Sequence, residues 1–485
     1  MPDLPFLMLD PDPTILARLP LSVLVGLAIA SLVTLAILTV ISMVRLNQSM
    51  ERWPSARSTS ATSASATAET RVPDVSLGLD YRKLWAGNAA SNLGDGISFV
   101  AIPLLATAFT SDPVLIAGLS MVNSGARLLV VLPIGVLIDR VNRTTILWAA
   151  NLGRGLLLAT LALVVANGAG SIAALYGVFA LIGVMESAAD NSSLSVLPAI
   201  VKTEDLDEAN SQISAAQLVA DEFAGPPLGG LMFAAAIALP FAAMGALYAA
   251  AAVLFLGLRV KVRPERMPDQ AGSIGSDLLV GARWLKGNRL LFGLAVIGGL
   301  ASVAYMIPFS ILVLFSQEVL GLDAAGYGVL LSASAVGGLV GSIIAAPLRR
   351  RAGYARTVVG SLALGAMTLA AVSFTTVPWV AAICLAAYIL HAVVWGICVN
   401  SLRQRLVPDH LRGRVNAVSK LLGLVGLTLG AGLGGVVAAA FGLGASFLAG
   451  GSIFAVCALA AWPLIREWEK GRSPEETSVG WTFRG

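Results

Sequence analysis

The stretch Gly135-Val-Leu-Ile-Asp-Arg-Val-Asn-Arg143 decides the fold of this 485-residue chain. It separates two long apolar runs, and its acid, Asp139, is followed at once by Arg140 and then by Arg143. Charge at the edge of an apolar run is typical of membrane proteins, whose cytoplasmic connections are rich in Lys and Arg. The order of glycine, acid and two bases is more specific, and we call Gly135, Asp139, Arg140 and Arg143 the clasp.

The composition independently indicates a membrane protein. Hydrophobic residues make up 57% of the chain and charged residues only 12%, whereas a soluble chain of this length needs more charge to cover its surface. The 50 glycines fit the close packing of membrane helices. The net charge of +4 is explained by bases that flank membrane spans, so the lipid bilayer is an expected partner and nucleic acid is not.

Apolar segments long enough to cross about 30 Å of hydrocarbon recur along the chain in two sets of six. We predict spans near residues 84–110, 114–138, 144–166, 171–196, 208–235 and 238–258, and near 290–316, 325–348, 357–376, 379–400, 415–440 and 444–464. The predicted fold class is an all-α membrane protein with two six-helix halves. Its predicted parts are the halves 81–258 and 290–465, the central cytoplasmic loop 259–289 and the cytoplasmic tail 466–485.

The bases fall on alternate connections between the spans. They include Arg82, Lys83, Arg140, Arg143, Lys202, the stretch 259–289, Arg349 to Arg351, Arg403 to Arg414, Arg466 and Lys470. The connections in between, at 111–112, 167–168 and 317–324, contain no Lys or Arg. We therefore expect a multi-pass protein of the plasma or inner membrane, with both ends of the twelve-span core in the cytoplasm.

The segment before the core predicts an extra transmembrane helix. Residues 19–44 carry no charge, acids precede them and arginines follow them, so residues 1–45 are expected to start outside and end inside. Residues 46–80 are expected to form a flexible cytoplasmic linker, rich in Ser, Thr and Ala over 54–70. The alternative is that translation begins at Met43 or Met50 and the extension is not made.

The two halves also share a sparse repeat. Gly135 and Arg143 precede Gly341 and Arg349 by 206 positions each, at the same place in a six-span unit. Several matches at one offset favour two parallel repeats.

Charged residues inside the spans carry the functional argument, because such residues are costly in lipid and usually face a partner or a wet cavity. They are Asp95, Arg127, Arg154, Glu186, Asp190, Asp221 and Glu222 in the first half, and His391 in the second. At a helical rise of ~1.5 Å per residue, Asp95, Arg127 and Arg154 lie about 15–16 Å in from the cytoplasmic ends of their spans. An ion pair of Asp95 with Arg127 or with Arg154 is therefore expected. The alternative role for these charges is to hold the first half together.

The acids outnumber the bases, so at least one acid is expected to be protonated or to line a wet cavity. We take Asp95 and Asp190 as the leading proton-coupling candidates, followed by Glu186, Asp221 and Glu222. His391 and Trp395 are substrate-cavity candidates, with interhelical hydrogen bonding or packing as the alternative.

The chain lacks the signatures of an enzyme or an ATP-driven pump. There is no phosphate-binding Gly-x-x-x-x-Gly-Lys-Ser/Thr loop, and His391 and His410 are the only histidines. We therefore expect no enzyme, no cofactor and no metal site.

Several motifs together resemble a known family. They are Tyr81-Arg-Lys-Leu-Trp-Ala-Gly-Asn, Ser91-Asn-Leu-Gly-Asp95 with Ala101-Ile-Pro103, the clasp, Leu197-Pro198, Asn210, and Arg405-Leu-Val-Pro-Asp-His-Leu-Arg-Gly-Arg414. Over residues 79–465 the chain resembles major facilitator superfamily transporters, and within them the bacterial branch of the enterobactin exporter and the macrolide efflux proteins. Val201-Lys-Thr departs from the proline that this branch tends to have there.

This resemblance implies a monomeric secondary transporter that exports a small amphiphilic compound, such as a drug, siderophore or secondary metabolite, in exchange for protons. It also implies alternating access, with the clasp gating the cytoplasmic side. A membrane scaffold or sensor that does not transport, and an importer of the same fold, are the alternatives.

Overall fold

A computed structural model describes residues 77–138, 141–259 and 274–470 of the chain. Ten helices in these residues are long and apolar enough to cross a membrane. One of them, α13 (Ala324–Phe374), holds two spans, because the chain turns at Gly353 with φ at 79°, a conformation that favours glycine. A further span is built from three shorter segments, α7, η2 and α8. The described residues thus contain twelve crossings, and the predicted all-α fold of two six-helix halves is confirmed.

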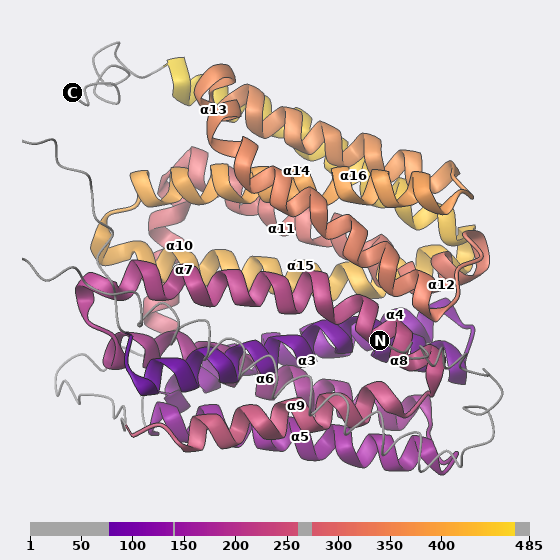
Figure 1. Ribbon diagram of the computed structural model, residues 1–485. Helices are drawn as coiled ribbons and strands as arrows, with labels where there is room; N and C mark the ends of the chain where they lie inside the picture. Colours follow the sequence, from indigo (N-terminus) through magenta and orange to yellow (C-terminus); the bar gives the residue numbers. More distant parts are fainter. Residues whose placement is uncertain (1–76, 139–140, 260–273, 471–485) are drawn as a thin grey trace, which may run out of the picture. The chain divides into compact units, whose positions relative to one another are not determined.

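The first half (indigo to magenta in Figure 1) consists of α3 (Leu79–Phe109), α4 (Pro113–Ile138), α5 (Arg143–Ala166), α6 (Ile172–Ile200), η1 (Thr203–Asp205), α7 (Leu206–Gln217), η2 (Leu218–Ala224), α8 (Gly225–Ala235) and α9 (Leu239–Leu256). The second half (pink to yellow) consists of α10 (Ile274–Gly287), α11 (Arg289–Phe309), α12 (Leu312–Leu314), η3 (Phe315–Val319), α13, α14 (Pro378–Leu406), α15 (Asp409–Phe441) and α16 (Leu443–Lys470). The predicted extra helix lies outside the described residues, as does most of the linker at 46–80.

Polar side chains begin several of these helices. Asn142, Ser171, Asn288 and Asp323 each accept a hydrogen bond from a backbone N–H in the first turn that follows. Such caps satisfy donors that the helix itself leaves free. The apolar length of each span sets its extent, and the caps set where it begins.

Helix α10 was not predicted, since residues 259–289 were expected to form a loop. Leu285 of α10 is 2% exposed and packs with Leu291 and Val415. Gly281 lies against the backbone of Arg414 in α15. The apolar face of α10 thus covers the ends of α11 and α15. The helix was not predicted because the charged residues of this segment make its overall composition polar.

The fifth span departs from regular α-helix just before the sequence Gly225-Pro-Pro-Leu-Gly-Gly230, which begins α8. Proline has no N–H, so Pro227 cannot bond to the carbonyl four residues earlier, that of Phe223. The hydroxyl of Ser332 in α13 donates to this carbonyl instead, at 2.9 Å. The π-helical turn η2 lies directly before the prolines, and π-helical turns are frequent at functional sites.

Glycines let α3 and the fifth span cross closely. A methyl group at Gly96 would lie 2.5 Å from the backbone oxygen of Asp221, and one at Gly225 would lie 2.5 Å from the Cα atom of Gly96. No side chain fits at either position. This crossing fixes η2 directly beside Asp95.

The two halves contact each other toward one end of the helices. A methyl group at Gly435 in α15 would lie 2.8 Å from the Cα atom of Val114 in α4, and Gly328 in α13 meets the backbone of Pro226 in α8. The connections that carry the bases lie at one end of the bundle, which we call the basic end. The residues of these two contacts lie far from it. The located contacts between the halves thus run from the end opposite the basic end to the middle of the spans, where Gly125 of α4 lies against Thr428 of α15.

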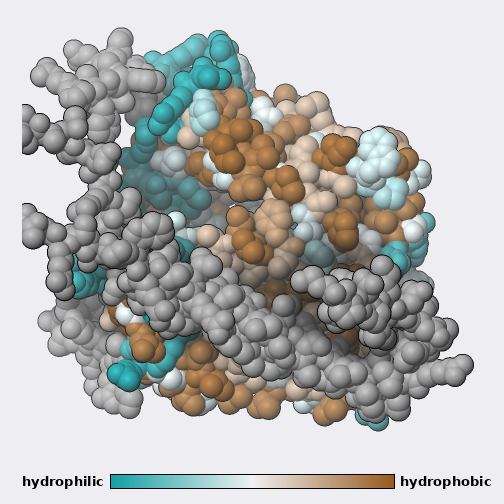
Figure 2. Space-filling model, in the orientation of Figure 1, coloured by the Kyte–Doolittle hydropathy of each residue, from teal (hydrophilic) through white to brown (hydrophobic). Residues whose placement is uncertain are grey.

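The surface of the bundle matches a lipid environment. Figure 2 shows hydrophobic residues over most of the described face, with hydrophilic residues gathered toward its ends. Leucines and other apolar side chains are exposed in mid-helix, among them Leu129 at 78% and Ile343 at 67%. In water such exposure would be unfavourable, whereas a bilayer solvates it.

Candidate functional site

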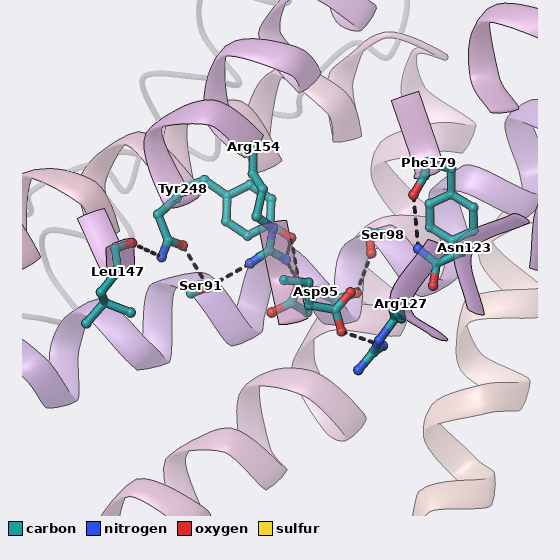
Figure 3. Close-up of polar contacts among 11 residues, drawn as sticks. Ser91, Asp95, Ser98, Asn123, Arg127, Leu147, Arg154, Phe179 and Tyr248 are labelled. Atoms are coloured by element: carbon teal, nitrogen blue, oxygen red, sulfur yellow. Dashed lines mark hydrogen bonds and ion pairs between the residues drawn. The ribbon is translucent and has the colours of Figure 1, made fainter. Parts of the chain in front are cut away.

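Asp95 lies in a polar network that joins three helices of the first half (Figure 3). Arg154 of α5 forms an ion pair with the Asp95 carboxylate of α3. The Tyr248 hydroxyl of α9 donates to Asp95 Oδ1 at 2.8 Å and accepts from Arg154 Nη2 at 2.8 Å. The sequence left open whether Arg127 or Arg154 would pair with Asp95, and the structure shows that it is Arg154.

The network extends along α3 and α5. Arg154 Nη1 donates to Ser91 Oγ at 3.3 Å, and this hydroxyl donates to Asn151 Oδ1 at 3.0 Å. Arg154 is 0% exposed, and its guanidinium carbon lies 4.0 Å from the centre of the Tyr248 ring. A fully buried guanidinium needs a counter-charge, because an uncompensated buried charge is strongly destabilising. Asp95 supplies this counter-charge.

Arg127 forms a second and more open ion pair. Its Nη1 donates to Glu186 Oε1 at 2.9 Å, between α4 and α6. The two side chains are 30% and 24% exposed, against 1% for the side chain of Arg154. Nearby, Asn123 of α4 donates to the carbonyl of Phe179 in α6 at 3.0 Å. The same two helices are therefore tied twice, once by charge.

The other three candidate acids have no base partner among the described residues. Asp190 and Glu222 are exposed and Asp221 is half-buried, although all three lie well inside their spans. Asp190 is ten positions from the end of α6, about 15 Å. Asp221 and Glu222 lie in η2. Carboxyl groups that lie at this depth and form no ion pair are candidates for proton binding.

These acids act on one another. Asp221 is within electrostatic range of Asp95, Glu186, Asp190 and Glu222. Asp190 is also within range of Lys420 on α15, in the second half. The five acids thus form one negatively charged region, in which the first half supplies only Arg127 and Arg154 as described bases.

The clasp is only partly described. Gly135 lies in α4, and Arg143 is half-buried in the first turn of α5, after the cap Asn142. Asp139 and Arg140 lie outside the described residues. The gating role of the clasp remains a prediction from the sequence.

His391 and Trp395 differ in their surroundings. His391 is 1% exposed, its Nδ1 donates to the Tyr388 carbonyl, and its ring lies 4.9 Å from that of Phe454. A methyl group at Gly365 would lie 2.6 Å from its Nε2. His391 thus packs inside the second half and does not line a cavity in this conformation. Trp395 is half-buried.

Reasoning from the sequence missed Tyr248, Asn151 and Lys420. Tyr248 and Asn151 are neutral, and the search followed charge alone. Lys420 is a lone base eleven positions into α15, about 16 Å. Its place five residues inside the predicted span 415–440 was a usable signal.

The comparison with known families decides the classification. The sequence profile of the Major Facilitator Superfamily matches residues 84–426, well over half of the chain. The chain belongs to this superfamily. Its members are transporters and not enzymes.

Solved structures agree with this assignment at the level of the fold. A bacterial homologue of the iron transporter ferroportin, in an inward-facing state, is 19% identical with a TM-score of 0.61 and covers 81% of this chain and 99% of its own. The nucleoside transporter NupG, as a D323A mutant, is 12% identical with a TM-score of 0.66 and covers 79% and 99%.

A bacterial homologue of the human lysosomal transporter Spinster, in an inward-facing and occupied conformation, is 16% identical with a TM-score of 0.66 and covers 81% and 98%. Among curated proteins, none matches this facilitator sequence.

Proposed function

We propose that the protein is a secondary active transporter that exports a small amphiphilic compound in exchange for protons. The observation that carries this proposal is the set of acids in mid-span on the first half that form no ion pair with a described base: Asp190 and Glu222, which are exposed, and Asp221, which is half-buried. A scaffold that only needs to fold gains nothing from such groups, because each is costly to hold in a membrane.

Asp190 is the leading proton carrier under this proposal. The buried Arg154 needs Asp95 as its counter-charge, so Asp95 is a poor group to protonate in each cycle. Asp190 forms no ion pair with a described base. Arg154 and Arg127 of the first half lie within electrostatic range of it, as does Lys420, which belongs to the half that must move. A change in the distance between the halves would change the charge balance at Asp190.

The positions of the bases indicate how the protein is oriented in the membrane and which conformation the structure represents. With the basic end in the cytoplasm, contacts between the halves at the opposite end correspond to an inward-facing conformation. The direction of transport and the assignment to the enterobactin-exporter and macrolide-efflux branch rest on the motifs around Asp95 and at 405–414. The clasp is the proposed cytoplasmic gate.

The experiment is transport in proteoliposomes with an imposed pH gradient, using a panel of fluorescent and antibiotic compounds. We expect Asp190→Asn to abolish uphill transport and to leave gradient-free exchange of substrate intact, because exchange needs no proton release. Glu204→Gln, an exposed loop acid with a 74% exposed side chain, is the control. Uphill transport by Asp190→Asn at the wild-type rate would contradict the assignment. Failure of the wild-type protein to move any compound of the panel would favour a scaffold or sensor.

A further inference from the structure

Three tyrosines of the second half gather at one place. The Tyr305 ring of α11 stacks on Phe309 at 4.4 Å and on Tyr388 of α14 at 6.3 Å between ring centroids. Tyr327 of α13 and Tyr388 each lie within electrostatic range of Tyr305. We call Tyr305, Phe309, Tyr327 and Tyr388 the aromatic cluster. Tyr327 and Tyr388 are 3% and 1% exposed, whereas Tyr305 and Phe309 are half-buried and form its open side.

The hydroxyl groups of this cluster lack partners. The chain has seven tyrosines, and four of them, Tyr81, Tyr176, Tyr248 and Tyr354, form a hydrogen bond through the hydroxyl. No described residue forms one with the hydroxyl of Tyr305, Tyr327 or Tyr388. None of the three oxygens is among the buried side-chain atoms without a partner in the described residues. Three hydroxyls that are not buried and bond to no described residue can therefore bond to a ligand.

The aromatic cluster faces an acid of the first half. Glu222 of η2 is within electrostatic range of Tyr305, and it is exposed and has no ion pair among the described residues. Both residues lie sixteen positions into their spans, which begin at Leu206 and Arg289. They are thus at a similar depth, about 24 Å along each helix from its start.

We propose that Glu222 and the aromatic cluster bind the positively charged group of an organic cation. The inference rests on the proposed function, because it names the class of compound that the transporter would carry. A carboxylate neutralises the cation, aromatic ring faces attract it, and the hydroxyl groups bond to polar atoms of the same molecule. Asp221, next to Glu222, adds negative potential.

The same arrangement disfavours a metal ion as the cargo of this site. Within the described residues, no group of three His, Cys, Asp or Glu side chains is placed to hold a metal. Hard divalent cations require several oxygen ligands, whereas a carboxylate beside stacked rings suits an amphiphilic ammonium or phosphonium compound.

The test measures binding of two probes to the purified protein by equilibrium dialysis, corrected for binding to empty detergent micelles. Tetraphenylphosphonium and tetraphenylborate have similar size and apolar surface but opposite charge. We expect the phosphonium to bind at least about tenfold more tightly than the borate. Glu222→Gln should weaken phosphonium binding about tenfold, or about 1.4 kcal/mol.

Matched variants separate binding from folding. Glu318→Gln removes another exposed glutamate from a π-helical turn, η3, and should leave phosphonium binding unchanged. Tyr305→Ala should weaken binding by about three- to tenfold, whereas Tyr305→Phe keeps the ring and should recover most of the affinity. Each variant should elute as a single species and unfold cooperatively before its affinity is compared.

Equal binding of the two probes, or unchanged phosphonium binding by Glu222→Gln, would overturn the inference. Transport of only neutral or anionic compounds against a gradient, without phosphonium binding, would also overturn it and would leave the proposed function standing. The predicted binding pattern without uphill transport of any compound would support the site and refute the proposed function.

Discussion

Replacing Asp95 by Asn tests whether this acid serves stability or transport. The substitution keeps the shape of the side chain and removes its charge, which leaves Arg154 buried at 0% exposure. The remaining described partners of Arg154, Ser91 at 3.3 Å and the Tyr248 hydroxyl at 2.8 Å, are both neutral. Breaking a buried ion pair from one side costs about 3–5 kcal/mol, because the other charge stays uncompensated. We expect a loss of that size in the free energy of unfolding.

The measurement is reversible unfolding in mixed micelles as the denaturing detergent is increased. Tyr248→Phe removes a hydroxyl bonded to both ions and should cost about 1.5–3 kcal/mol. The double variant Asp95→Asn, Arg154→Met removes both charges and should regain most of the stability lost in Asp95→Asn alone. Glu204→Gln again serves as the control with an exposed acid.

An unfolding free energy of Asp95→Asn within about 0.5 kcal/mol of the wild type would refute this reasoning. Arg154 would then be stable without Asp95, and Asp95 would return to the first rank of proton carriers. Loss of uphill transport in Asp95→Asn at unchanged stability would lead to the same reassignment.

Three further predictions concern packing, gating and topology. Gly96→Ala should cost about 1–3 kcal/mol of stability, since its methyl group would lie 2.5 Å from the Asp221 oxygen, whereas Gly177→Ala, with open space around it, should be neutral in the same unfolding assay. Asp139→Asn should leave insertion normal and slow transport at least tenfold in proteoliposomes, because the clasp is the proposed cytoplasmic gate. Near-normal transport rates would show that Asp139 has no gating role. A cysteine in place of Gln270 should react with an impermeant reagent only in opened cells, and labelling from outside intact cells would invert the topology.

Hydropathy was sufficient to predict the spans, because each must bury about 20 apolar residues in lipid whatever its neighbours are. It did not predict helix rotation. Asp95, Arg127 and Arg154 were placed at one depth, but the choice of Arg154 as partner depends on which faces of α3, α4 and α5 meet. That choice is made by close packing, such as the contact of Gly94 with the Tyr248 ring.

Two other features depended on contacts that sequence patterns do not reveal. Residues 349–356 were expected to connect two spans as a loop, whereas α13 continues through them except for the turn at Gly353. The aromatic cluster combines residues from three helices, and none of its members is unusual alone. Tyr305 and Glu222 come together only because the two halves face each other.

The location of each charge contact determines what it can do in an alternating-access cycle. If the halves rock as rigid bodies, contacts within one half persist and contacts between the halves are exchanged. Both strong ion pairs, Arg154 with Asp95 and Arg127 with Glu186, join helices of the first half. They therefore stabilise that half and leave the cycle to groups at the boundary. The bond from Ser332 to the Phe223 carbonyl crosses this boundary one residue from Glu222, so separating η2 from α13 must break it beside the proposed cation site.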